Sequence, residues 1–250
     1  MPRINQSWFE FNGKKSTDMD VRLMDVHLFS RGEDRGAQTA VAGRSGYVWI
    51  GDGANGEFDI KRTCRAPVSQ LRRISAWLSG SGNLRFSQEE DAMYEARIIK
   101  AIEYKRVLPG MNSLYEFAVT FSCQPFPRVW PEAEPIEITQ SGTELVTRGT
   151  APALPRIEIA GSGDFYLTIG MQTLAFTNVD GGIIVDSELG DALTADGALL
   201  ANDCVDGELF RIQSGLNTVS WILGGTDDDT GEPTPGSIQK VTITPRWRYL

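Results

Sequence analysis

Four prolines close together divide this chain of 250 residues into two parts of similar length. They are Pro125, Pro127, Pro131 and Pro135. Proline lacks a backbone N–H and holds the residue before it in an extended conformation, so neither a helix nor a central strand runs easily through such a segment. The cluster therefore predicts a stiff linker at about residues 124–136, between one domain of residues 1–130 and another of residues 131–250.

The first part is predicted to be mostly β with one helix. Alternating apolar and polar residues, or short apolar runs, predict strands at residues 7–11, 47–50, 57–61 and 114–121. From Val68 to Leu78 the apolar residues instead recur every three or four positions, which predicts one amphipathic helix at about residues 67–79, closed by Gly80. Residues 92–107 are compatible with a helix or a strand. The turn signal Pro109–Asn112, which joins them to the next strand, favours a hairpin.

The second part shows no convincing helical period. Strand patterns occur at residues 136–139, 156–159, 165–169, 183–185, 209–212, 218–222 and 240–244. Glycine-rich turn signals at residues 161–163 and 180–182 separate several of them. Short strands at this density are typical of a β-sandwich. The predicted fold is thus a barrel-like or sandwich-like β-domain with one helix, followed by a second β-sandwich.

The composition argues against catalysis and metal binding. The chain has a single histidine, His27, so any Ser-His-Asp or Cys-His site would have to be built around it. The alternating residues around His27 make a hydrogen-bonded strand position the simpler interpretation. The three cysteines at positions 64, 123 and 204 form no C-x-x-C motif. We therefore assign no catalytic, metal-binding or cofactor-binding residue, and we expect a protein that is not an enzyme and has no cofactor.

Cysteine use and hydropathy bear on where the protein folds. An odd number of scattered cysteines in apolar contexts favours buried, reduced thiols and a reducing cytoplasm. No apolar stretch approaches the ~20 residues that a membrane-spanning helix needs. The first residues, Met1–Asn5, lack the apolar core of a signal peptide. We expect neither ordinary secretion nor insertion into a membrane.

The net charge of −9 is distributed unevenly. Residues 1–130 contain 18 Lys and Arg against 15 Asp and Glu, a net charge of +3, whereas residues 131–250 contain 6 against 18, a net charge of −12. The acidic part would repel phosphate groups and anionic lipid. The first part has no long basic run. The sequence therefore gives no reason to expect general nucleic-acid binding.

Two local motifs have a chemical interpretation that their context disfavours. Residues 51–56 read G-x-G-x-x-G, but a dinucleotide site needs a helix directly after the motif, and the following pattern predicts a strand. A glycine-rich hairpin loop is the better interpretation. Residues 227–232 are rich in aspartate but lack the alternate-residue spacing of a calcium loop, which favours a solvated acidic loop.

Aromatic residues of the second part offer an alternative function. Tyr166, Trp221, Trp247 and Tyr249 could form stacking platforms for sugars, because β-sandwiches often carry them. Positions in the core or in a protein interface are the simpler interpretation. A carbohydrate-binding β-sandwich that takes part in adhesion to a host surface is therefore the alternative hypothesis for the chain.

Several segments, taken in order, resemble the distal tail protein (Dit) family of long non-contractile-tailed bacteriophages. In the first part they lie at residues 9–14, 43–47, 74–78, 82–87, 93–96 and 117–126. In the second part they lie at residues 151–157, 184–188 and 207–221. Each segment alone is weak, but their order and spacing extend the resemblance over nearly the whole chain. One departure is that Phe210, Arg211, Gln213 and Ser214 stand where the family often has proline.

The resemblance implies a structural protein of the virion. It implies an N-terminal ring-forming β-domain and a C-terminal galectin-like β-sandwich. Six copies would form a ring that joins the tail tube protein to the hub or fibre protein of the tail tip, with a channel for DNA. The implied location is the tail tip of a phage, assembled in the cytoplasm of the bacterial host. Receptor-binding proteins are possible further partners, whereas sequence-specific nucleic-acid binding and membrane insertion are not implied.

Overall fold

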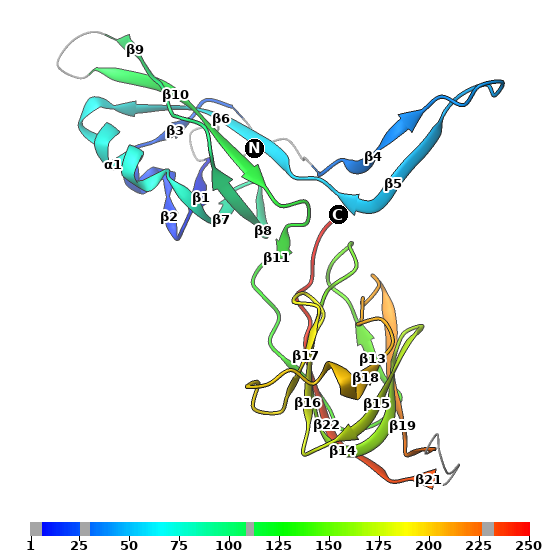
Figure 1. Cartoon of the computed structure of the whole chain (residues 1–250). Helices are drawn as coiled ribbons and strands as arrows, with labels where there is room; N and C mark the ends of the chain where they lie inside the picture. Colours follow the sequence, from blue (N-terminus) through cyan, green and yellow to red (C-terminus); the bar gives the residue numbers. More distant parts are fainter. Residues whose placement is uncertain (1–6, 26–30, 109–112, 227–232) are drawn as a thin grey trace. The chain divides into compact units, whose positions relative to one another are not determined.

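The computed structural model describes residues 7–25, 31–108, 113–226 and 233–250. Over these residues the chain is mostly β with one α-helix, which confirms the predicted fold class. The chain forms two compact units, which we call the first unit (residues 1–130) and the second unit (residues 131–249, leaving the last residue aside) (Figure 1). His27, the turn signal Pro109–Asn112 and the acidic segment 227–232 lie outside the described residues.

The first unit is built on a nine-stranded antiparallel sheet. Its strands follow the order β2-β1-β7-β8-β10-β6-β3, with β9 paired to β10 and β11 paired to β8. The strand bounds are β1 (Phe9–Phe11), β2 (Lys14–Lys15), β3 (Arg22–Leu23), β6 (Phe58–Pro67), β7 (Gly80–Phe86), β8 (Glu89–Ile98), β9 (Tyr104–Leu108), β10 (Leu114–Cys123) and β11 (Arg128–Val129). A 3-10 turn, η2 (Ser16–Met19), follows β2.

The sheet of the first unit curls around an aromatic core. Phe9 and Phe11 of β1 lie 5.5 and 5.7 Å, centroid to centroid, from Phe121 of β10, although β7 and β8 separate the two strands in the sheet. All three phenylalanines are fully buried. Apolar and polar residues alternate along β6 and β10, so one side of each strand faces this core and the other faces outward.

The predicted helix forms, but it is shorter than the pattern suggests. The α-helix α1 (Leu71–Trp77) follows a 3-10 turn, η3 (Val68–Gln70), where the period predicts helix over residues 67–79. Ile74 and Trp77 are its buried residues. Gly80 has a φ of +75° and begins β7, so the chain leaves the helix directly into a strand.

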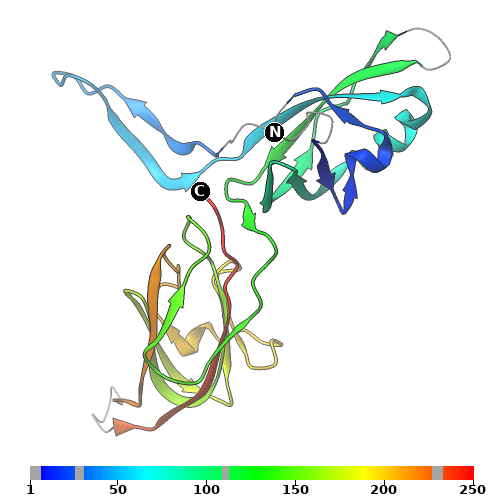
Figure 2. The same ribbon diagram turned by 180° about the vertical axis from the view of Figure 1, so that it is seen from behind.

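Two further strands form an arm that is separate from the nine-stranded sheet. They are β4 (Asp34–Thr39) and β5 (Val48–Asn55), which pair only with each other. Together with the turn between them they define the arm, residues 34–55. Figures 1 and 2 show this two-stranded ribbon extending away from the sheet of the first unit. Residues 51–55 therefore lie within a strand, and the expected glycine-rich hairpin loop is wrong.

The proline-rich segment is less of a linker than the sequence suggests. Residues 124–130 belong to the first unit. Val129 of β11 is buried, and the N–H of Trp130 donates to the carbonyl of Asp91 at 2.7 Å. The next strand, β12, begins at Ile136. Of the proline-rich segment, residues 131–135 are the part that lies outside both the first unit and regular structure.

The second unit contains another nine-stranded antiparallel sheet, which curls around its own core. Its elements are β12 (Ile136–Ile138), β13 (Thr143–Val146), β14 (Arg156–Ile169), β15 (Gln172–Val179), β16 (Ile183–Asp186), β17 (Asp191–Thr194), η4 (Asn202–Cys204), β18 (Val205–Asp206), β19 (Leu216–Leu223) and β22 (Gly236–Thr244). A separate pair, β20 (Gly225–Thr226) and β21 (Pro233–Thr234), completes it.

The long strand β14 organises the second unit. Its first half pairs with β22 and β16, and its second half pairs with β15 and β19. The predicted turn at residues 161–163 lies inside β14, where the pairing register shifts. A Cβ on Gly161 or Gly163 would collide with the backbone of Ser237 or Pro235. These glycines thus permit close strand approach and a bend, not a chain reversal.

Most of the other strands predicted for the second unit form. The exception is residues 209–212, which make only an isolated bridge between Ile212 and Ala153. Phe210 and Ile212 are nevertheless buried, so the apolar residues there fill the core without a strand.

Candidate functional site

The thiols of this protein are in environments that suppress their reactivity. Cys64 and Cys123 are buried, and burial raises the pKa of each to about 12. Cys204 is partly exposed, which departs from the expected burial, and desolvation together with Asp203 raises its pKa as well. A thiol with a raised pKa holds little of the reactive thiolate at neutral pH. Within the described ranges no group of three or more His, Cys, Asp or Glu residues is placed to hold a metal ion.

Three of the four aromatic residues considered as a sugar platform, Tyr166, Trp221 and Trp247, share no exposed surface. Tyr166 is 41% exposed and pairs with Ile222, whereas Trp221 pairs with Leu167. Neighbouring pairs in a ladder point to opposite faces of the sheet, so Tyr166 and Trp221 lie on different faces. Trp247 is buried. The geometry gives the carbohydrate-binding alternative no common stacking surface.

The arm is the most unusual surface of the first unit. Four apolar residues on it are exposed by 45–60% of their area: Val41, Tyr47, Trp49 and Ile50. An isolated two-stranded ribbon is at best marginally stable in water, and exposed apolar patches mark sites of association. The arm therefore has the properties of an element that is completed by a partner.

Glycines determine how the indole of Trp49 lies on the arm. A Cβ on Gly36 would come within 2.6 Å of the Trp49 ring, and one on Gly51 within 2.8 Å of its Nε1. The indole thus packs directly against the backbone of both strands, where only glycine leaves room. This packing accounts for Gly51, one of the glycines of the G-x-G-x-x-G motif, without any ligand.

Asp52, inside that motif, places a carboxylate against the backbone and a neighbouring arginine. Its Oδ1 accepts the N–H of Ala54 at 3.0 Å, and its Oδ2 accepts Nη2 of Arg35 at 2.6 Å. The bond from Ala54, joined by the charge of Arg35, lowers the pKa of the Asp52 carboxyl. The next element, β6, is a strand. The motif thus lacks the helix of a dinucleotide site, and the amides of Ala54 and Gly56 already have acceptors in the protein.

Polar contacts join the two strands of the arm at its base, and Gly32 beside the base packs against the rest of the first unit. Asn55 donates from Nδ2 to Oδ1 of Asp34 at 2.9 Å, and the N–H of Gly56 donates to the carbonyl of Glu33 at 2.8 Å. Gly32 is buried, and a Cβ there would come within 2.9 Å of Pro125. Only residues 47–50 of the arm carry a strand pattern in the sequence, because its strands alternate poorly and residues 51–54 are Gly-Asp-Gly-Ala.

Comparison with known proteins shows which class of protein has this fold. The chain has the fold of a component of a bacteriophage adsorption apparatus. One solved structure with this fold is the Dit protein (gp 19.1) of phage SPP1, described as a paradigm of the hub adsorption apparatus in phages that infect Gram-positive bacteria. The likeness has a TM-score of 0.68 at 16% identity and covers 98% of this chain and 99% of SPP1 Dit.

Other comparisons add little to this likeness. A chain of the phage p2 baseplate in its activated conformation with strontium aligns with a TM-score of 0.39 at 12% identity, over 94% of this chain and 97% of that one. No family model matches the sequence, and no curated protein matches it. No helix among the described residues is long and apolar enough to cross a membrane.

Proposed function

We propose that this protein is a structural component of a bacteriophage tail tip, a distal tail protein. The observation that carries the proposal is the likeness to SPP1 Dit, which extends over 98% of this chain and 99% of that protein, so that both units and their order along the chain are shared. In this role the protein is not an enzyme and needs no cofactor.

The proposed assembly is a hexameric ring made by the first unit. The ring joins the tail tube protein to the hub or fibre protein and leaves a channel for DNA, within a virion assembled in the host cytoplasm. Closed rings use two different faces of each subunit, so that every copy offers an element that its neighbour receives. The exposed apolar arm is suited to be the element that docks on the neighbouring subunit in such a contact.

The second unit fits a position outside the ring contacts. Residues 131–250 carry a net charge of −12, and six such units in close contact would repel one another. We propose that this galectin-like sandwich projects from the ring into solvent, where salt screens its charge. Receptor-binding proteins are candidate partners there.

The proposal predicts that the arm is needed for assembly. Ile50→Asp places a charge on a residue of the arm that is 60% exposed, and burying that charge in an intersubunit contact is unfavourable. We expect the variant to stay monomeric, measured by light scattering, at concentrations where the unaltered protein forms rings visible by electron microscopy.

Ile222→Asp is the matched control for this experiment. Ile222 is 70% exposed on β19 of the second unit, so the residue type, the substitution and the exposure are comparable. This variant should assemble normally. If both variants assembled equally well, the arm would not be part of the contact between subunits. A layer of this protein in assembled tails with a symmetry other than six-fold or three-fold would contradict the ring itself.

A further inference from the structure

The outward side of the first unit's sheet gathers positive charge from distant parts of the sequence. Pairing between strands places Lys105, Glu116, Arg65 and Arg22 in one row across β9, β10, β6 and β3. Lys61 lies four residues from Arg65 along β6, on the same side. Arg97 of β8 pairs with Ser122, which pairs with Asp59 of β6. We call these five cations, Arg22, Lys61, Arg65, Arg97 and Lys105, the basic face.

This face is the side of the sheet away from the core. Along β6, Lys61, Thr63 and Arg65 alternate with the buried residues Ile60, Arg62 and Cys64. The helix α1 lies on the core side, because its Trp77 stacks on Phe9. Adjacent strands are about 4.8 Å apart and residues rise by about 3.4 Å, so the face measures roughly 15 by 20 Å.

Two acidic residues in these rows are held in ion pairs with cations. Glu116 pairs with Arg65 at 2.8 Å, and Asp59 pairs with Lys100 at 2.6 Å. The other four cations of the face, Arg22, Lys61, Arg97 and Lys105, are exposed and form no ion pair with any residue that the structure describes. Among the described residues, the face therefore presents four cations that are not held in an ion pair.

The chemistry between the cations favours a phosphate backbone over an acidic protein surface. The residues there are Thr63, Ala118, Thr120 and Ser122, and these rows carry no aromatic side chain. Protein interfaces centre on apolar and aromatic anchors and are depleted in lysine. Phosphate contacts, in contrast, come from arginine, lysine and hydroxyl side chains.

We propose that the basic face binds the sugar-phosphate backbone of nucleic acid, without sequence preference. Binding would neutralise phosphates with up to four cations and release their counterions. The acidic second unit, with its net charge of −12, opposes binding and keeps it weak. The proposal does not depend on the proposed ring, because a single subunit carries the whole face.

The test measures how the full-length protein binds a short fluorescent DNA duplex of mixed sequence as the salt concentration varies. Four phosphate contacts predict a slope of log K against log salt of about −3 to −4. The double variant Lys61→Ala with Arg97→Ala should reduce the slope by about 2 and weaken binding by about tenfold or more at low salt.

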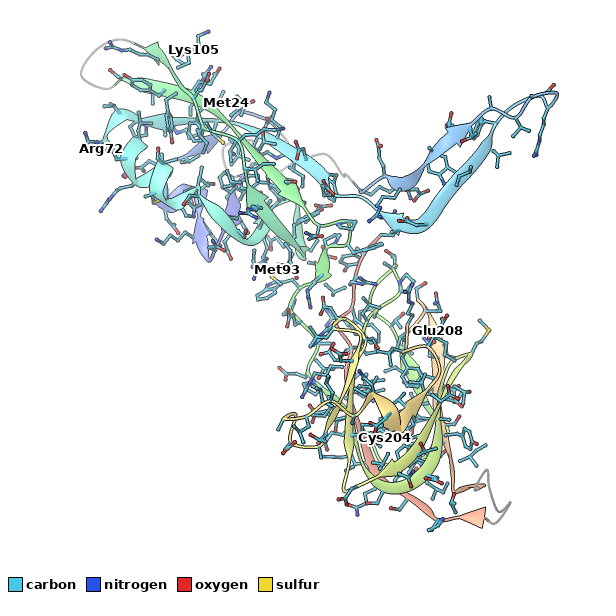
Figure 3. All side chains as sticks on the ribbon, viewed as in Figure 1. Met24, Arg72, Met93, Lys105, Cys204 and Glu208 are labelled. Carbon is cyan, nitrogen blue, oxygen red and sulfur yellow. The ribbon has the colours of Figure 1, made fainter. Side chains whose placement is uncertain are left out.

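The matched control removes two arginines from the other side of the first unit. Arg72 and Arg73 are exposed on α1, so Arg72→Ala with Arg73→Ala changes the net charge by the same amount (Figure 3, where Arg72 and Lys105 are labelled). This control should keep the unaltered slope. Light scattering of every variant at the same concentration shows whether its oligomeric state has changed. A loss of DNA binding with intact assembly is then distinct from a failure of the ring.

Three results would overturn the proposal. The first is no binding of the duplex at about 50 mM salt, where phosphate contacts are strong. The second is an equal loss in both double variants, which would indicate a dependence on net charge alone. The third is tighter binding of labelled poly-glutamate than of DNA of equal charge, which would assign the face to an acidic protein.

Discussion

At the residue scale, the contact between Asp186 and Arg246 holds the chain end of the second unit onto β16. Arg246 donates from Nη1 and Nη2 to the two oxygens of the Asp186 carboxylate, at 2.6 and 2.9 Å. The N–H groups of Glu188 and Leu189 donate to Oδ1 of the same carboxylate. Asp186 is only 3% exposed, so its charge depends on these donors.

The ionisation of Asp186 links this contact to pH. Burial alone would raise the pKa of its carboxyl, but the bonds from Arg246 and from the N–H of Leu189 outweigh burial, so the pKa is lowered overall. A pKa that is lower in the folded state stabilises the fold above the unfolded value, 3.8. This contribution is lost as the pH falls through the folded value.

We predict that Arg246→Asn lowers the free energy of unfolding at neutral pH by about 3 kcal/mol, because it leaves a buried carboxylate without its cation. Asparagine is chosen because Arg246 has a φ of 49°, a left-handed conformation that asparagine tolerates. Denaturant titrations at neutral pH and below pH 4 should show the difference shrinking in acid, as Asp186 becomes protonated.

Lys240→Ala is the control for this variant. Lys240 pairs with Glu137 at 2.7 Å, but the two side chains are 41% and 61% exposed. An exposed ion pair contributes about 0–1 kcal/mol, so this change should be nearly neutral at both pH values. Equal effects of the two substitutions would show that burial of Asp186 does not matter.

At the element scale, α1 is too short to be stable by itself and depends on its contacts. Trp77 provides them. Its ring stacks on Phe9 with 5.3 Å between centroids, and its indole N–H donates to the carbonyl of Phe11 at 2.9 Å. One side chain thus joins the helix to β1 by both apolar and polar contact.

Trp77→Phe should lower the free energy of unfolding by about 1–3 kcal/mol, because an aromatic ring remains but the buried carbonyl of Phe11 loses its donor. Thermal unfolding followed by circular dichroism measures the change. Val68→Ala is the control, since Val68 is 48% exposed in the turn before α1 and should change stability by less than about 0.5 kcal/mol. An unchanged unfolding temperature for Trp77→Phe would contradict the role of the indole N–H.

Elements were predictable where one face is buried and the chain is regular. The strands β6 and β10 alternate between core and outward residues, so their period was visible in the sequence. The turn predicted at residues 161–163 was wrong, because Gly161 and Gly163 permit a close approach of strands and do not reverse the chain. The arm has no buried face, so no period marks its strands.

The surfaces were less predictable than the strands. The cations of the basic face stand at positions 22, 61, 65, 97 and 105, and only the pairing of strands brings them together. A search for basic runs along the chain cannot detect such a face. Apart from the resemblance to Dit proteins, the sequence thus predicted the kind of fold but neither surface on which the proposals rest.

At the scale of the whole molecule, the boundary between the two units is narrower than the proline pattern suggests. Residues 124–130 are held by β11, and Arg128 pairs with Glu95 at 2.9 Å. The strand β12 begins at Ile136. Glu132 and Glu134 between them are exposed.

We predict that a glutamate-specific protease cuts first after Glu132, because the exposed backbone there lies in neither sheet. Glu134 precedes Pro135 and should resist cleavage. Trypsin should cut after Arg128 far more slowly, since this residue lies in β11. Mass spectrometry of a time course identifies the first products. Early cleavage after Arg128 would mean that β11 does not protect the segment.

The place at which the arm leaves the first unit has an evolutionary consequence. The strands β3 and β6, between which the arm is inserted, pair with each other at Arg22 and Leu23. The chain therefore departs from and returns to the same edge of the sheet, and the arm behaves as a cassette within a hairpin. The pairing of the nine-stranded sheet does not involve residues 34–55, so a change in their length or sequence leaves that pairing intact. In the proposed role, the surface that contacts a partner could thus change in evolution while the sheet stays the same.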